Sequence, residues 1–106
     1  MPKNYRTQRL DRNEARKRIS YIVSKAPSSV IISEHARSEA AKDGMASTDI
    51  QNVLISPAAK ILGNGEFERG SFRYRFETEF MMVVVAFWED GEGLNVVTTW
   101  DKRKRK

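Results

Sequence analysis

The sequence contains no cysteine, a single histidine and only three prolines among its 106 residues. Without cysteine, the chain can form neither a disulfide framework nor a thiolate metal site. One histidine leaves only scattered carboxylates as metal ligands, so we expect no metal and no other cofactor. No glycine-rich nucleotide-binding loop and no serine-hydrolase nucleophile motif is present either.

Long hydrophobic runs are also absent. The longest, residues 80–88, is far shorter than the ~20 residues that a membrane-spanning helix requires. Residues 1–20 lack the apolar segment of a signal peptide, so we expect a cytoplasmic protein without membrane contact. The chain has the length of one domain. We predict a flexible basic arm over 1–10, a single domain over 11–103 and a basic tail over 104–106.

Positive charge is concentrated at the two ends of the chain. Residues 1–25 hold eight basic and two acidic residues, and residues 101–106 hold five and one. Residues 26–100 hold six basic and eleven acidic residues, so this middle part is acidic although the net charge is +5. Such a distribution favours a nucleic-acid contact if the ends meet in the fold. A solubilising helix face plus a frayed tail would explain it equally well.

Helical spacing of apolar residues predicts three helices, over 12–25, 34–43 and 48–55. Asp11 is a suitable N-cap for the first helix, with Glu14 at the third helical position. Ser33 can cap the second helix, which we expect to end at Asp43-Gly44. Ser47 precedes the third helix. The short β-branched run 30–32 between the first two helices predicts a strand or an extended entry.

The pattern changes from helical to alternating after residue 58. We predict strands over 59–62, 71–77, 80–88 and 94–100, with turns at 63–65 and 89–93. Alternation within 71–77 places aromatic residues on one face and Arg73, Arg75 and Glu77 on the other. The expected fold is therefore α+β, with three N-terminal helices packed on a three- to four-stranded antiparallel sheet.

The polar residues best fit the metal-free cleavage of a phosphodiester. That reaction needs a group that deprotonates a 2′-hydroxyl and cations that stabilise the developing negative charge. Arg73 and Arg75 lie about 7 Å apart on one strand face, similar to the spacing of phosphates in an extended strand. The other available groups are His35, Lys60, Arg69, Tyr74, Lys102 and Arg103. Tyr74 shares its strand face with Phe72 and Phe76, so we expect it in the core and not at the site.

Several segments resemble small bacterial proteins of the RelE/ParE toxin superfamily, in the element order of MqsR-type toxins. The strand and two helices read IISEHARSEAAKDGMASTDIQNVL, and the sheet reads RGSFRYRF, MMVVVAFW and LNVVTTWDK. The resemblance covers roughly residues 11–103. It implies a RelE-like fold and a metal-independent endoribonuclease toxin of a type II toxin–antitoxin system. Such a toxin cleaves mRNA, on or off the ribosome, and is neutralised by a cognate antitoxin protein.

The resemblance also implies site residues. Lys60 occupies the place of a functional lysine after the third helix, and Lys102 that of a lysine at the end of the last strand. With Arg73, and with His35 as proton-transfer partner, they form the expected catalytic set. The residues expected to contact RNA are Arg69, Arg75, Arg103 and Lys104. Phe80 stands where the family has an active-site tyrosine, and the family's glutamine before the Arg-rich strand has no clear counterpart.

Two other functions are compatible with the sequence. One is a non-catalytic module of the same fold that binds nucleic acid or a protein, which the missing tyrosine favours. The other is a structural protein whose sheet edge pairs with another chain. In either case Arg73 and Arg75 can form a solvated face with cross-strand ion pairs, while His35 and Lys60 are ordinary surface residues.

Overall fold

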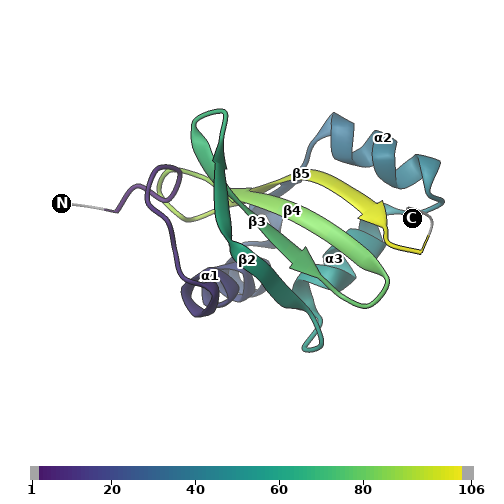
Figure 1. The fold of residues 1–106 in the computed structure, drawn as a ribbon, viewed down its shortest axis with the longest axis horizontal. Helices are drawn as coiled ribbons and strands as arrows, with labels where there is room; N and C mark the ends of the chain where they lie inside the picture. Colours follow the sequence, from purple (N-terminus) through teal and green to yellow (C-terminus); the bar gives the residue numbers. More distant parts are fainter. Residues whose placement is uncertain (1–2, 104–106) are drawn as a thin grey trace.

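The computed structural model describes residues 3–103, and Figure 1 shows their arrangement. In chain order the elements are α1 (Arg12–Lys25), the short 3-10 helix η1 (Pro27–Ser29), β1 (Val30–Ile32), α2 (Glu34–Lys42), α3 (Ser47–Ile55), β2 (Lys60–Glu68), β3 (Ser71–Glu77), β4 (Met81–Phe87) and β5 (Leu94–Asp101). No helix in this part of the chain is long and apolar enough to cross a membrane.

The α+β class is confirmed, but the prediction of a three- to four-stranded antiparallel sheet is wrong. The sheet has five strands in the order β1-β5-β4-β3-β2, and it is mixed. β1 lies parallel to β5, with Val30 opposite Leu94, whereas the other pairs are antiparallel. The β-branched run 30–32 does form a strand. Its pairing with the last strand of the chain, 64 residues later in the register, could not be read from local pattern.

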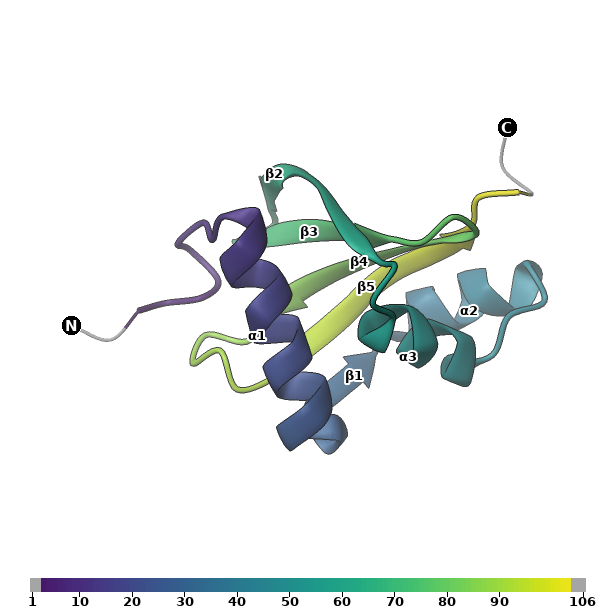
Figure 2. The same ribbon diagram turned by 90° about the horizontal axis from the view of Figure 1, so that it is seen from below.

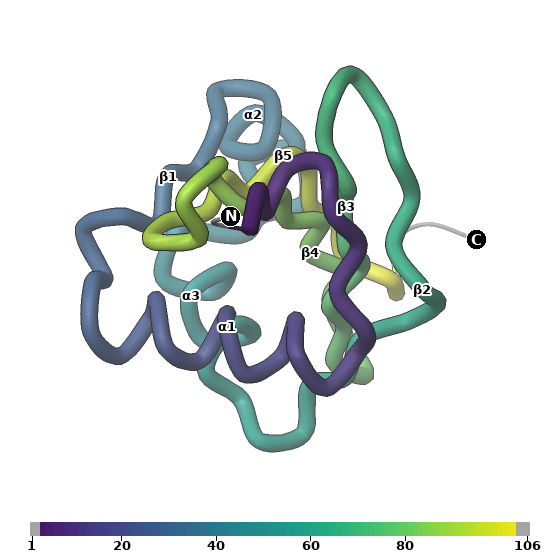
Figure 3. The backbone as a smooth tube through the Cα atoms, turned by 90° about the vertical axis from the view of Figure 1, so that its left-hand side faces the viewer, coloured from purple at the N-terminus to yellow at the C-terminus, as the bar shows by residue number. Residues whose placement is uncertain are grey.

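α2 takes the place of a longer β1 beside the second half of β5. Ser33 donates its N–H to the Val96 carbonyl oxygen and its hydroxyl to that of Val97, both at 3.1 Å. At the other end of the helix, the Asp43 carboxylate accepts the N–H of Asp101 at 2.9 Å. α2 therefore runs along β5 (Figure 1), and the end-on view of Figure 3 shows the two side by side. The two ends of the helix satisfy backbone groups at this edge.

The first two helices begin as predicted. The Asp11 carboxylate accepts the N–H of Glu14 at 2.8 Å, and this bond lowers the pKa of Asp11. The Ser33 hydroxyl accepts the N–H of Ala36 at 3.0 Å. Both caps satisfy N–H groups that lack a partner within the helix. α1 turns its apolar stripe towards the sheet, where three residues are buried: Ala15, Ile19 and Ile22.

α3 begins one residue earlier than predicted. Ser47 is its first residue, because the Asp49 carboxylate accepts the N–H of Ala46 at 2.8 Å and makes Ala46 the N-cap. The buried side of the helix is the predicted one: Ile50, Val53 and Leu54. α1 and α3 together cover one face of the sheet, which Figure 2 shows from the helical side.

The predicted turn over 63–65 is wrong. β2 continues through these residues and pairs with β3 on both sides of a bulge between Leu62 and Glu66. Gly63 and Gly65 have φ angles of 77° and 81°, a left-handed conformation that costs glycine little. The two glycines therefore bend the strand without ending it. The hairpin turn follows at Arg69-Gly70, where both residues have positive φ.

β4 lies at the centre of the sheet, as its apolar sequence predicted. All seven of its residues are buried, and their side chains alternate between the two faces. Met81, Val83, Val85 and Phe87 join the main core under α1 and α3. The three residues between them face the opposite side: Met82, Val84 and Ala86.

The N-terminal segment, expected to be a flexible arm, contributes to the packing from residue 3 onward. Tyr5 donates its N–H to the carbonyl oxygen of Glu89 at 2.9 Å. The Arg6 carbonyl oxygen accepts the N–H of Phe72 at 2.8 Å. Leu10 is 2% exposed and belongs to the hydrophobic core. The described part of this segment thus connects α1 to the ends of β3 and β4.

Candidate nucleic-acid interface

The sheet face turned away from α1 and α3, here called the open face, carries the predicted arginines. Arg73 lies in one row with Ala86 of β4 and Asn95 of β5. Arg75 lies in the next row on this face, with Val84 and Thr98. The predicted alternation of β3 is therefore confirmed, and it places both arginines beside the buried Ala86 and Val84 of β4.

Each of these arginines is paired with one glutamate of the edge strand β2. Arg73 Nη1 lies 3.4 Å from Glu68 Oε2, and Arg75 Nη2 lies 3.6 Å from Glu66 Oε1. The glutamate side chains are 61% and 68% exposed, so each pair contributes only about 0–1 kcal/mol. Arg73 Nε is buried and has no hydrogen-bond partner. The two pairs border a shallow cavity of about 140 Å³ whose far wall is Trp100.

Lys102 lies at the end of the same face, beside Glu77. Its Nζ donates to Glu77 Oε2 at 2.8 Å and to the Thr78 carbonyl oxygen at 3.0 Å. Lys60 is exposed and sits opposite Glu77 in the β2–β3 register, without an ion pair to any residue between 3 and 103. Glu77 is therefore flanked by two lysines. From Arg73 to Glu77 the face extends about 13 Å, so the cations form a row rather than one pocket.

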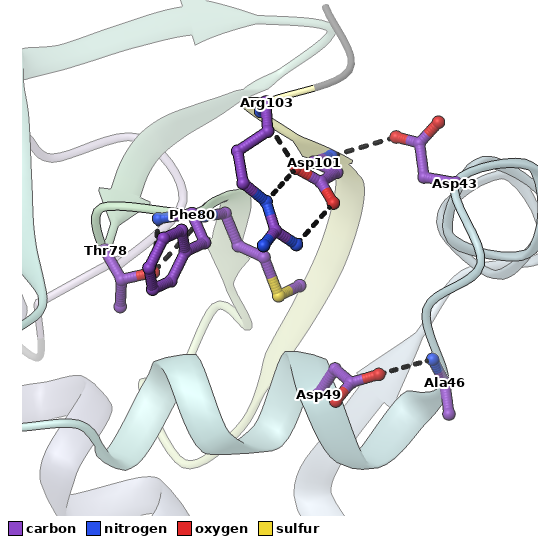
Figure 4. Close-up of polar contacts among 8 residues, drawn as sticks. Asp43, Ala46, Asp49, Thr78, Phe80, Asp101 and Arg103 are labelled. Atoms are coloured by element: carbon purple, nitrogen blue, oxygen red, sulfur yellow. Dashed lines mark hydrogen bonds and ion pairs between the residues drawn. The ribbon is translucent and has the colours of Figure 1, made fainter.

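Arg103 has a structural role that the sequence did not indicate. Its Nε and Nη2 donate to the two carboxylate oxygens of Asp101 at 3.1 and 2.9 Å, and its guanidinium lies 4.8 Å from the centre of the Phe80 ring. Figure 4 shows this arrangement, with the Asp43 carboxylate on the other side of Asp101. The hydrogen bond to Asp101 raises the pKa of Arg103. Two of the three guanidinium nitrogens of Arg103 are thus already bonded to Asp101 within the protein.

His35 is separated from the other predicted catalytic groups. It lies exposed in the first turn of α2, whereas Lys102 follows the end of β5 that contacts Asp43, beyond the last turn of α2. A nine-residue helix is about 13.5 Å long, and this length separates the two groups along β5. Arg69 is exposed in the β2–β3 turn, away from this end. Lys104 lies outside the described residues.

Sequence reasoning missed several polar neighbours of the arginines. A second cavity, of about 310 Å³, adjoins the Arg73 row and is bordered by Arg6, Trp88 and Asn95. From the sequence, Trp88 was assigned to the end of an apolar strand, and Arg6 to a flexible arm. The alternation of residues 94–100 is a signal that could have indicated Asn95. If Leu94 faces the core, its neighbour Asn95 faces the open side of the sheet.

Among residues 3–103, no group of three or more histidine, cysteine or carboxylate side chains is placed to hold a metal ion. No protein-family model, curated protein or solved structure matches the chain. The membership in the RelE/ParE superfamily therefore stays a prediction that rests on the motifs of the sequence.

Proposed function

We propose that this protein binds RNA on the open face of its sheet, with backbone phosphates at Arg73 and Arg75. The observation that carries the proposal is the placement of these two arginines. They occupy neighbouring positions on one face, about 7 Å apart, and each is held by a single ion pair to an exposed glutamate.

Exchange of the glutamates for phosphates is energetically feasible. Exposed ion pairs contribute about 0–1 kcal/mol, whereas an arginine can bind a phosphate with two parallel hydrogen bonds. Arg73 Nε, which has no partner in the free protein, gains one when the side chain turns to a phosphate. Release of counterions from the RNA favours the same exchange.

Metal-independent cleavage is a second candidate function, favoured by the position of Glu77. Its side chain is 12% exposed, with Lys102 Nζ at 2.8 Å and Lys60 on the adjacent strand. Glu77 would accept the proton of a ribose 2′-hydroxyl, whose oxygen then bonds to the neighbouring phosphorus while the bond to the 5′-oxygen breaks. Lys102 would give a proton to that leaving oxygen. In this mechanism Glu77 replaces His35 as the base.

The toxin role, the endoribonuclease activity on mRNA and the antitoxin partner are predictions from the resemblance to the RelE/ParE superfamily. They require cleavage as well as binding. Growth arrest on expression that is lost in Glu77→Gln, while the variant is still produced and folded, would support them.

Binding is tested with a labelled single-stranded RNA in EDTA, by fluorescence anisotropy at several salt concentrations. The Arg73→Ala/Arg75→Ala variant should bind at least tenfold more weakly than the wild type. The slope of log affinity against log salt should fall by about 1.4, since each phosphate neutralised on a single strand contributes about 0.7.

The matched control is Arg12→Ala/Lys25→Ala, which removes two exposed cations from α1 and changes the net charge equally. It should weaken binding less than threefold. Equal losses in the two double variants would reject the open face as the binding surface. The same samples, resolved on a denaturing gel, test cleavage: intact RNA after prolonged incubation with the wild type would reject the catalytic candidate and leave the binding function.

A further inference from the structure

The cavity beside the Arg73 row has the volume and the mixed apolar and polar lining that a nucleobase requires. Its volume of about 310 Å³ exceeds that of one base, and Ala86 contributes an apolar surface. Arg6 and Glu89 bring opposite charges to its border, so the cavity itself is close to neutral. An uncharged planar group suits such a space better than a phosphate does.

Trp88 is held rigidly in this cavity. A Cβ at Gly93 would lie 2.5 Å from the indole ring, so one ring face packs directly on the Gly93 backbone. The Trp88 N–H of the main chain donates to the Gly93 carbonyl oxygen at 2.9 Å, and Nε1 donates to Asn95 Oδ1 at 3.1 Å. An indole fixed in this way can stack a base without losing further side-chain freedom.

Asn95 and Arg6 supply polar contacts around the ring. Because Asn95 Oδ1 accepts from Trp88, its amide orientation is set and its NH2 group remains available to the edge of a base. Arg6 is exposed, and its side chain makes no ion pair or hydrogen bond with any residue in the 3–103 range. Asn95 shares its row with Arg73, so this cavity continues directly from the phosphate row.

From this geometry we infer that the cavity takes one unpaired base of the bound RNA. The base stacks on Trp88, its edge bonds to Asn95, and the adjoining phosphate binds Arg6. This inference rests on the proposed RNA binding and adds that the ligand is single-stranded, because a base in a duplex is not free to enter.

The chain's two tryptophans make a direct test available. In Trp100→Phe, Trp88 is the sole tryptophan, and titration with single-stranded RNA should quench its fluorescence. A duplex of the same sequence and an abasic ribose-phosphate strand of the same length should leave the emission nearly unchanged. Asn95→Ala and Arg6→Ala should each weaken binding of the base-containing strand about three- to tenfold. Asn95→Ala should leave binding of the abasic strand unchanged, because Asn95 contacts only the base. Arg6→Ala should weaken binding of the abasic strand as well, because Arg6 contacts a phosphate.

Trp88→Phe should bind single-stranded RNA more weakly than the wild type, because its smaller ring offers less stacking surface to the base. Circular dichroism checks that this variant folds. If single-stranded RNA binds in an Arg73-dependent manner while Trp88 emission is unchanged and Asn95→Ala binds like the wild type, the base site is overturned and the proposed function stands. Equal affinity for the abasic strand would also overturn it. Absence of any RNA binding would instead remove the proposed function itself.

Discussion

At the scale of single residues, Tyr74 joins three parts of the molecule. Its hydroxyl oxygen accepts the N–H of Leu10 at 2.9 Å, and its ring packs at 5.5 Å against that of Phe87. The side chain is 1% exposed, and this burial raises the pKa of Tyr74 above its usual value of 10.0. The sequence already placed this residue on the aromatic face of β3, so the structure confirms it as a core residue.

Tyr74→Phe should lower the free energy of unfolding by about 1–2 kcal/mol, because it leaves the buried N–H of Leu10 without an acceptor. Urea unfolding near neutral pH measures this loss. Tyr21→Phe, at a side chain that is 43% exposed, should change the stability by less than about 0.5 kcal/mol. A loss as small in Tyr74→Phe as in Tyr21→Phe would contradict the role of the buried bond.

The stability difference between the wild type and Tyr74→Phe should also depend on pH. The raised pKa of Tyr74 means that the unfolded chain ionises first, from about pH 10 upwards, while the folded protein keeps its proton. The stabilisation is therefore complete below pH 10 and is lost as the pH rises through the folded pKa. The stability difference between the wild type and Tyr74→Phe should narrow above pH 10, as urea unfolding across this range would show; a constant or widening difference would argue against it.

At the scale of elements, two glycines in the bulge of β2 allow this strand to continue where a turn was predicted. Gly63 and Gly65 share positive φ angles, but their surroundings differ. A Cβ at Gly65 would lie 2.9 Å from the Tyr74 ring, whereas one at Gly63 would meet nothing within 4 Å. Gly65 is therefore needed for both the conformation and the close approach.

We expect Gly63→Ala to cost about 1 kcal/mol through its positive φ alone. Gly65→Ala should cost at least about 1 kcal/mol more, since the added methyl group presses against a buried ring. Chemical unfolding of the two variants measures the difference. Equal losses would show that the bulge, and not the contact with Tyr74, is what constrains Gly65.

Local pattern predicted the helices, their Asp11 and Ser33 caps and the two faces of β3, because each depends on neighbours within a few residues. It failed where the partner lies far along the chain. The length of β2 and the parallel β1 follow from tertiary pairing. For that reason the glutamates that form ion pairs with Arg73 and Arg75 were missed. They follow residues 63–65, which had been assigned to a turn, and belong to the unpredicted second half of β2.

At the scale of the whole molecule, the N-terminal segment bridges the two layers. The Tyr5 ring lies 6.3 Å from that of Phe87 and 4.8 Å from the Arg18 guanidinium of α1. Its backbone bonds reach the β3 and β4 ends of the sheet. The segment thus fastens the helical layer to the sheet at the end opposite Lys102.

Removal of residues 1–9 should lower the stability by about 2–3 kcal/mol, since it deletes two inter-element hydrogen bonds and the packing of Tyr5. Differential scanning calorimetry of the shortened and full chains measures the effect. Tyr5→Ala in the full chain should account for about half of it. An unchanged melting temperature after the deletion would mean that these contacts add nothing to the fold.

The position of β5, between β1 and β4, has a consequence for the order of folding. Val30 of β1 pairs with Leu94 of β5, 64 residues later, and α2 docks on the same strand. Until β5 has joined β4, β1 and α2 have no strand to dock on, and the central β4 lacks one of its two neighbours. Domains whose pairing spans such long separations fold slowly. We therefore expect β1, α2 and β5 to assemble together in one late step of folding.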